Sequence, residues 1–177
     1  MAIILENIFD TDEYFEMWNF LSNENYESIV KSTYAPNRLE KWYGYSTNLG
    51  SLGNNDILTK EDNIPRVFNR IKNEYYSNAD SILLCCGDKP RSDTTIGKHR
   101  DHGNFEGKAI MINFGRSLFI EYPYDSDEIE YELQDGDVIE INTKLIHESI
   151  QTSKLRLNAT LRKVKKQYLP KFDKPLF

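Results

Sequence analysis

The feature that most constrains the fold is a strictly alternating segment near the carboxyl end of the chain, at residues 155–162. Its odd-numbered positions are Leu, Leu, Ala and Leu, whereas its even-numbered positions are Arg, Asn, Thr and Arg. A period of two indicates a β-strand with two different faces. A half-buried surface strand explains the alternation, but not two arginines and an amide in place of Lys and Glu. A strand inside a β-roll explains both faces, because its aliphatic side can pack against outer helices while its polar side lines a cavity.

The second half of the chain is rich in further short strands, whereas helical periodicity is confined to the first half. A helix is predicted over residues 11–22, where Asp10 and Glu13 have capping-box spacing, and a second helix is predicted to begin at Pro65. Early helices followed by many short strands predict an α+β fold, a double-stranded β-helix (jelly-roll) core with N-terminal helices packed on one face. The predicted strands are short apolar or alternating runs at residues 81–86, 109–114, 118–122, 128–133 and 137–141.

Length and charge narrow the classes of function. The chain has 177 residues and no linker-like stretch, so we expect a single domain over residues 1–177. It carries 22 basic and 28 acidic residues, a net charge of −6, which argues against an obligate nucleic-acid packaging protein. The charge is uneven, because residues 121–140 hold nine acids and no Lys or Arg, whereas residues 154–177 hold eight basic residues and one acid. Such blocks are either solvated faces or, for the basic block, a surface beside an anionic substrate.

The cysteines and the apolar runs indicate the cellular compartment in which the protein is expected. Cys85 and Cys86 are the only cysteines, and a disulfide between neighbours in a strand would be strained. We therefore expect two reduced thiols and an intracellular, reducing compartment, either cytoplasmic or nuclear. No apolar run approaches the ~18 residues needed to cross a bilayer, so no membrane association is expected. No obligate protein partner is evident.

Two of the three histidines combine with an acid to form a candidate metal site. His99 and Asp101 are two residues apart, so on an extended strand both side chains point to one face. His147 follows a predicted strand and can supply a third ligand. Two histidines and one carboxylate form the facial triad of non-haem iron(II) sites, which leaves positions open on the metal. The same groups also suit Zn²⁺, so the triad alone does not name the metal.

Arg156 and Arg162 lie on the polar face of the alternating segment that follows this triad. Each guanidinium can hold a carboxylate through two parallel hydrogen bonds. The pair therefore suits a dicarboxylate bound beside the metal.

Taken together, these motifs resemble the AlkB family of Fe(II)- and 2-oxoglutarate-dependent dioxygenases. The resemblance covers roughly residues 36–166, with a substrate-side segment at about 36–60 and a catalytic β-roll at about 80–166. The motifs that carry it are Pro36 and Arg38, Trp-Tyr-Gly at 42–44, Ile-Gly-Lys-His-Arg-Asp at 96–101, His147, Arg-x-Asn-x-Thr-x-Arg at 156–162 and Leu-Arg-Lys-Val at 161–164.

The resemblance implies an enzyme that uses Fe(II), 2-oxoglutarate and O₂ to dealkylate N-alkylated bases in DNA or RNA, by hydroxylation of the alkyl carbon. Its implied partner is alkylated single- or double-stranded nucleic acid. Arg156 would hold the distal carboxylate of 2-oxoglutarate, Arg162 would lie near the carboxylate that chelates the metal, and Asn158 would support the same site. The implied iron ligands are His99, Asp101 and His147. The implied substrate-pocket residues are Trp42, Tyr43 and Tyr45.

At two places the sequence departs from the family pattern, so the resemblance does not fix the identity of the substrate. Residues 84–88 read Leu-Cys-Cys-Gly-Asp, where the family usually offers an Asn and a Tyr to the cosubstrate. Gly103 stands where relatives often place an acid that touches the substrate base. The alternative is a hydroxylase of a small molecule, a modified base or a protein side chain with the same chemistry, and a third candidate is a metal-free β-roll that only binds a ligand. For a nucleic-acid substrate, Lys163, Lys165 and Lys166 are the expected phosphate contacts.

Overall fold

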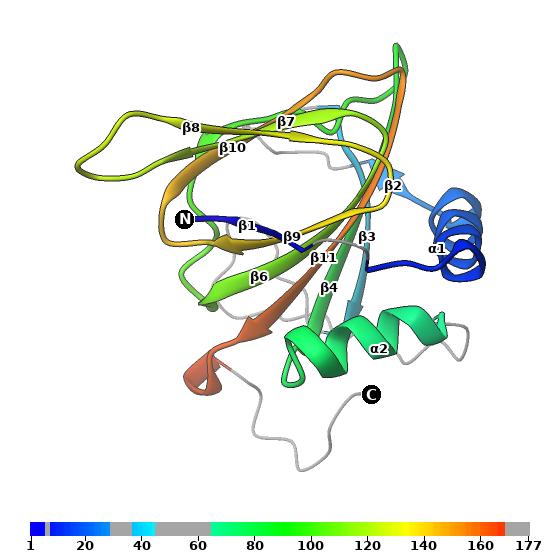
Figure 1. Cartoon of the computed structure of the whole chain (residues 1–177), viewed down its shortest axis with the longest axis horizontal. Coiled ribbons are helices and arrows are strands. Elements are labelled where there is room, and N and C mark those ends of the chain that lie inside the picture. The colour runs from blue at the N-terminus through cyan, green and yellow to red at the C-terminus, as the bar shows by residue number, and fades with distance from the viewer. Residues whose placement is uncertain (6–7, 29–36, 45–64, 169–177) are drawn as a thin grey trace.

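The computed structural model describes residues 1–5, 8–28, 37–44 and 65–168, which form two antiparallel sheets and two α-helices (Figure 1). The larger sheet has seven strands in the order β1-β9-β6-β11-β4-β3-β2, and the smaller has four in the order β5-β10-β7-β8. The strands are β1 (Ile3–Leu5), β2 (Glu27–Ser28), β3 (Leu39–Gly44), β4 (Ser81–Asp88), β5 (Ile96–His99), β6 (Phe105–Phe114), β7 (Ser117–Tyr122), β8 (Ile129–Leu133), β9 (Asp137–Asn142), β10 (Ile146–Gln151) and β11 (Leu155–Val164).

The two helices begin where the sequence predicts. Helix α1 (Thr11–Asn23) is capped by Asp10, whose side chain accepts from the Glu13 backbone while the Glu13 side chain accepts from the Asp10 backbone. This reciprocal pair satisfies two amides that a helix start otherwise leaves unpaired. Helix α2 (Arg66–Tyr75) starts directly after Pro65, which acts as its N-cap.

Both helices cover the outer face of the seven-stranded sheet, as Figure 1 shows. Met17, Leu21 and Phe68 from the helices are buried in one cluster with the aliphatic face of β11, formed by Leu157, Ala159 and Leu161. The predicted orientation of the alternating segment is therefore confirmed. Its polar face turns inward, toward the four-stranded sheet.

The four-stranded sheet closes the other side of the roll and brings two histidines together. Strand β10 pairs with β5 so that His147 and His99 are direct register partners. Neither strand is predicted from the sequence, because both are short and carry polar residues at alternate positions. The predicted α+β double-stranded β-helix with helices on one face is confirmed, whereas the extent of the domain over residues 1–177 stays a prediction.

The cysteines occupy opposite faces of β4. Cys85 is buried on the inner face, and Cys86 packs against the core under the helices; both are free thiols. Burial raises the pKa of the Cys85 thiol to about 11, so it is uncharged at neutral pH. Within the described ranges, no helix combines the length and apolar character needed to cross a bilayer.

The turn from β6 to β7 gives a stability prediction. Gly115 has a φ of +87°, and a Cβ there would lie 2.2 Å from the Leu155 carbonyl oxygen and 3.0 Å from the Arg156 Cα. We expect Gly115→Ala to lower the free energy of unfolding in urea by ~1–3 kcal/mol, because strain and a backbone clash combine. The matched control is Gly103→Ala, where a Cβ meets nothing within 4 Å. Equal losses in the two variants would contradict this account.

Candidate active site

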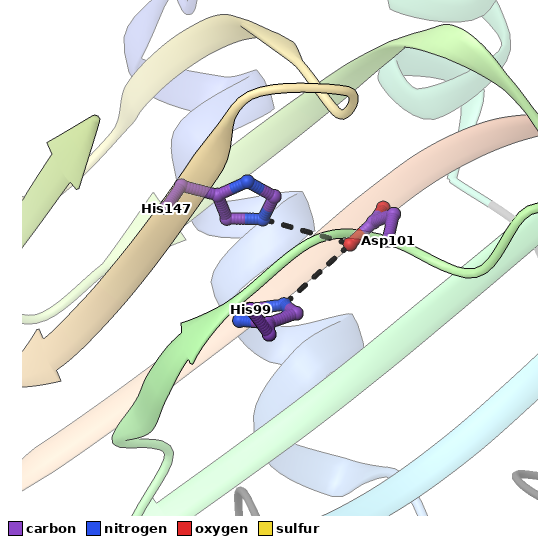
Figure 2. A group of neighbouring side chains, drawn as sticks. All are labelled: His99, Asp101 and His147. Carbon is purple, nitrogen blue, oxygen red and sulfur yellow. Dashed lines mark ion pairs between the residues drawn. The ribbon is translucent and has the colours of Figure 1, made fainter. Parts of the chain in front are cut away.

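His99, Asp101 and His147 converge at one end of the space between the sheets (Figure 2). His99 is the last residue of β5, Asp101 follows two residues later, and His147 lies on β10. The Nε2 atom of each histidine is 3.6 Å from Asp101 Oδ1. The three ligand atoms lie within 4.8 Å of one another. These separations are short enough for the three side chains to hold one divalent cation together.

Backbone carbonyls fix the orientation of both rings. His99 Nδ1 lies 2.8 Å from the Gly97 carbonyl oxygen, and His147 Nδ1 lies 3.0 Å from the Leu145 carbonyl oxygen. A carbonyl only accepts, so Nδ1 carries the proton in each ring. In the neutral ring Nε2 then presents its lone pair toward the carboxylate. Three electron-rich atoms that face one another fit a divalent cation, held by histidines that are oriented through their other ring nitrogen.

The Asp101 carboxylate is shared between this triad and β11. Arg162 Nε donates to Asp101 Oδ2 at 2.6 Å, which leaves Oδ1 for a metal. Burial alone would raise the pKa of Asp101, but the adjacent positive charge of Arg162 opposes that shift, and this pKa lies well below its usual range. The ligand is therefore a permanent anion at neutral pH.

A cavity of about 340 Å³ extends from the triad along the polar face of β11. Arg156 closes the far end and is only 1% exposed. Its Nε donates to Asn113 Oδ1 at 2.8 Å, and one of its terminal nitrogens donates to Thr94 Oγ1 at 3.1 Å. Both partners are neutral, and no carboxylate of the described residues pairs with this guanidinium.

Unpaired charge makes this end of the cavity a candidate anion site. Burial lowers the pKa of Arg156 to about 10, which still leaves it positive at neutral pH. The Ser149 hydroxyl also lines the cavity, buried and without a hydrogen-bond partner among the described residues. A buried cation without a counterion is costly, and an anionic ligand held by Arg156 and the nearby hydroxyls would relieve that cost.

Comparison of the whole chain with solved structures finds proteins with the same arrangement of sheets. An oxidoreductase of the 2OG-Fe(II) oxygenase family from Burkholderia pseudomallei matches with a TM-score of 0.65 and 15% identity, over 91% of this chain and 84% of its own. OsALKBH1 matches with a TM-score of 0.65 and 12% identity, over 92% and 97% of the two chains. A prolyl-4-hydroxylase from Pseudomonas putida matches with a TM-score of 0.61 and 9% identity, over 93% and 92%.

This chain has the 2OG-Fe(II) oxygenase fold. The resemblance stated from the sequence is confirmed at that level. At the level of sequence, no protein-family profile and no curated protein matches the chain. In this fold, the triad and the arginine-lined strand β11 line the same cavity.

The structure separates the aromatic residues predicted for the substrate pocket. Trp42 lines the cavity, and its ring is parallel to that of Phe105 at 6.5 Å between centroids. Tyr43 does not line it: the neighbouring side chain on β3 points to the opposite face, where the Tyr43 ring is buried in the core and its hydroxyl lies 2.8 Å from Glu24 Oε1. The prediction for Tyr43 is wrong, because adjacent residues of a strand cannot share a face. Tyr45 lies outside the described residues.

Other residues of the oxygenase fold are placed as follows. Asn158 lines the cavity between Arg156 and Arg162, as the alternation requires. Lys163 does not reach the cavity, because its ammonium pairs closely with Asp80. Sequence reasoning missed Thr94, Asn113 and Ser149, which come from three separate segments and carry no motif.

Loss of the shared carboxylate should abolish metal binding. We expect Asp101→Ala to weaken anaerobic Co(II) binding by more than about 100-fold, because even outer-shell changes around metal ligands cost ~10–100-fold. The matched control is Asp80→Ala, which removes the carboxylate that pairs with Lys163, a residue of the same strand as Arg162. Calorimetric titration measures both. An unchanged Co(II) affinity in Asp101→Ala would show that the triad is not the metal site.

Proposed function

We propose that this protein is an Fe(II)- and 2-oxoglutarate-dependent dioxygenase. The observation that carries the proposal is the buried Arg156 guanidinium without a carboxylate partner among the described residues, in the same cavity as the His99, Asp101 and His147 triad. A cation at one end and a metal site at the other match a dicarboxylate with a metal-binding end. Bound iron would supply the activation of O₂ for oxidation of a substrate C–H bond.

The residues along β11 would hold the cosubstrate in one orientation. Arg156 would bind the far carboxylate together with the hydroxyls of Thr94 and Ser149. Asn158 would lie beside the carbon chain of 2-oxoglutarate. Arg162, one of whose terminal nitrogens is buried without a partner among the described residues, would face the carboxylate at the metal while its Nε holds Asp101.

The direct test is turnover of the cosubstrate. Purified protein with Fe(II), 2-oxoglutarate and O₂ should release succinate, and omission of any one of the three should stop the release. Succinate release that persists without iron, or none under any condition with a folded protein that binds Co(II), would contradict the proposal.

The role of Arg156 can be tested apart from the metal. Arg156→Lys keeps the charge but loses the planar fork, so the free energy of 2-oxoglutarate binding should weaken by ~1–3 kcal/mol. Co(II) binding without 2-oxoglutarate should be nearly unchanged. Arg116→Lys, at an exposed turn, is the control and should change neither. An equal loss of metal affinity in Arg156→Lys would indicate that Arg156 supports the fold instead.

For the substrate, we propose an N-alkylated base in DNA or RNA, dealkylated by hydroxylation of the alkyl carbon. Cations rim the cavity at the metal end: Arg100 lines it, and Lys165 Nζ donates to the Gly103 carbonyl at 2.7 Å, beside the cavity-lining His102. Lys144 Nζ donates to the carbonyl oxygen of the cavity-lining Phe105 at 2.9 Å, and burial and the neighbouring Lys165 lower the pKa of Lys144. Cations at the rim can contact phosphates, and Trp42 offers a ring on which a base can stack. The likeness to OsALKBH1 supports the same proposal.

A second candidate is hydroxylation of a protein side chain or a small molecule. The net charge of −6 and the likeness to a prolyl-4-hydroxylase favour it. Salt dependence separates the two candidates, because only a polyanionic substrate releases counterions when it binds.

Neutralising Arg100 and Lys165 together should flatten the slope of log affinity against log salt by about 1.5, for a short single-stranded methylated oligonucleotide. The matched control changes Arg116 and Lys154, two exposed cations at the other end of β11. Fluorescence anisotropy across a salt series measures both slopes. Equal slopes for the two variants would show that Arg100 and Lys165 do not contact the phosphates of the oligonucleotide. Absence of oligonucleotide binding at low salt would favour the second candidate.

A further inference from the structure

The side chain of Gln151, the last residue of β10, joins three segments behind the anion end of the cavity. Gln151 is only 2% exposed. Its Oε1 atom accepts from the Thr94 amide at 2.9 Å and from the Thr94 hydroxyl at 3.0 Å. Its Nε2 atom donates to the Gly87 carbonyl oxygen at 2.9 Å and to the Ser153 carbonyl oxygen at 3.0 Å. One side-chain amide therefore ties Thr94 to β4 and to the turn between β10 and β11.

Thr94 lies outside the strands, in the segment between β4 and β5, so strand pairing does not fix its position. Its backbone amide donates to the Gln151 side chain instead. Its hydroxyl oxygen accepts from a terminal nitrogen of Arg156 at 3.1 Å. The Thr94 amide stays on Gln151 Oε1 whether the hydroxyl hydrogen points to Gln151 or to a bound carboxylate. Gln151 thus fixes the oxygen that Arg156 contacts.

The contacts of Arg156 with the described residues leave two of its five N–H groups for a ligand. Its Nε donates to Asn113 Oδ1, one terminal nitrogen donates to Thr94 Oγ1, and the other donates to Met111 Sδ at 3.7 Å. One hydrogen then remains on each terminal nitrogen, which is the number that a bidentate carboxylate requires. Because the hydrogen bonds to Asn113 and Thr94 fix the plane of the guanidinium, they also fix the direction of this pair.

Gly87 makes room for the amide of Gln151. It is the register partner of Arg156 on β4. A Cβ at this position would lie 2.0 Å from Gln151 Oε1 and 2.8 Å from the Thr94 nitrogen. Gly87 belongs to the segment 84–88, at which the sequence departs from the family pattern. The Gln151 amide therefore occupies the space that a side chain at position 87 would fill.

We propose that Gln151 is a positioning residue for Arg156, which acts through Thr94 to hold the guanidinium in the direction that receives the far carboxylate of 2-oxoglutarate. The inference rests on the proposed function and adds a residue that contacts neither the metal site nor the cosubstrate. His147, Ser149 and Gln151 are alternate residues of β10, and all three are buried. One face of this strand would then carry a metal ligand and, ~13 Å further along, the anchor of the anion end.

The test measures binding without O₂, so that it does not depend on turnover. 2-Oxoglutarate and 2-oxopentanoate are titrated separately into the Co(II)-loaded protein. 2-Oxopentanoate keeps the metal-binding end and the chain length, but a methyl group replaces the far carboxylate. Gln151→Met keeps the length of the side chain and removes its hydrogen bonds, so the dissociation constant for 2-oxoglutarate should rise about tenfold, as for one weakened hydrogen bond to a charged group. The constant for 2-oxopentanoate should be nearly unchanged, because this ligand has no carboxylate for Arg156.

Two further variants test the path from Gln151 to Arg156. Thr94→Val removes only the hydroxyl and should weaken 2-oxoglutarate binding to a similar extent. The double variant Thr94→Val with Gln151→Met should lose no more than the larger single loss, because both changes break the same link. The control is Gln134→Met, at an exposed glutamine after β8, which should change neither dissociation constant.

The outcomes separate this inference from the proposed function. Unchanged 2-oxoglutarate affinity in Gln151→Met, or equal losses for the two oxo acids, would overturn the inference and leave the dioxygenase proposal intact. Additive losses in the double variant would also overturn it, because Gln151 would then not act through Thr94. If the wild-type protein binds the two oxo acids equally, Arg156 does not hold the far carboxylate, and the proposed function fails together with the inference.

Discussion

The ion pair between Asp101 and Arg162 links the two walls of the roll. Asp101 follows β5 of the four-stranded sheet, and Arg162 lies on β11 of the seven-stranded sheet. The pair is almost fully buried, so removal of either partner would leave an uncompensated charge that costs ~3–5 kcal/mol. It fixes one carboxylate oxygen on β11 and leaves the other facing His99 and His147. The position of the metal site relative to the arginine-lined strand follows from this contact.

The space between the two sheets is lined by polar side chains. The inward face of β11 buries Arg156, Asn158 and Thr160, where a protein built only for stability would place aliphatic side chains. The hydrophobic core lies on the other side of the sheet, under α1 and α2, and supplies the stability that the cavity lacks. The cavity is lined on one side by this polar face of β11 and on another by Glu40 and Trp42 of β3.

Much of this arrangement could be predicted from the sequence, because strong periodicity carries it. The alternation at residues 155–162 predicted which side chains of β11 face the cavity, and the Asp10 capping box predicted the start of α1. Strands β5 and β10 were missed, since their short polar segments lack an apolar pattern. Tyr43 was assigned to the pocket together with Trp42, although adjacent strand residues point to opposite faces. The contacts of Arg156 with Thr94 and Asn113 join segments far apart in sequence, so no local sequence pattern predicts them.

The central claim is that one ligand spans the metal site and Arg156. The most direct measurement is anaerobic calorimetric titration of 2-oxoglutarate into the protein, with and without saturating Co(II). A ligand that touches both ends must bind more tightly when the metal is present, by at least about fivefold for a coupling of ordinary size. Equal affinities in the two titrations would show that the anion site at Arg156 and the triad bind independently, and would contradict the account.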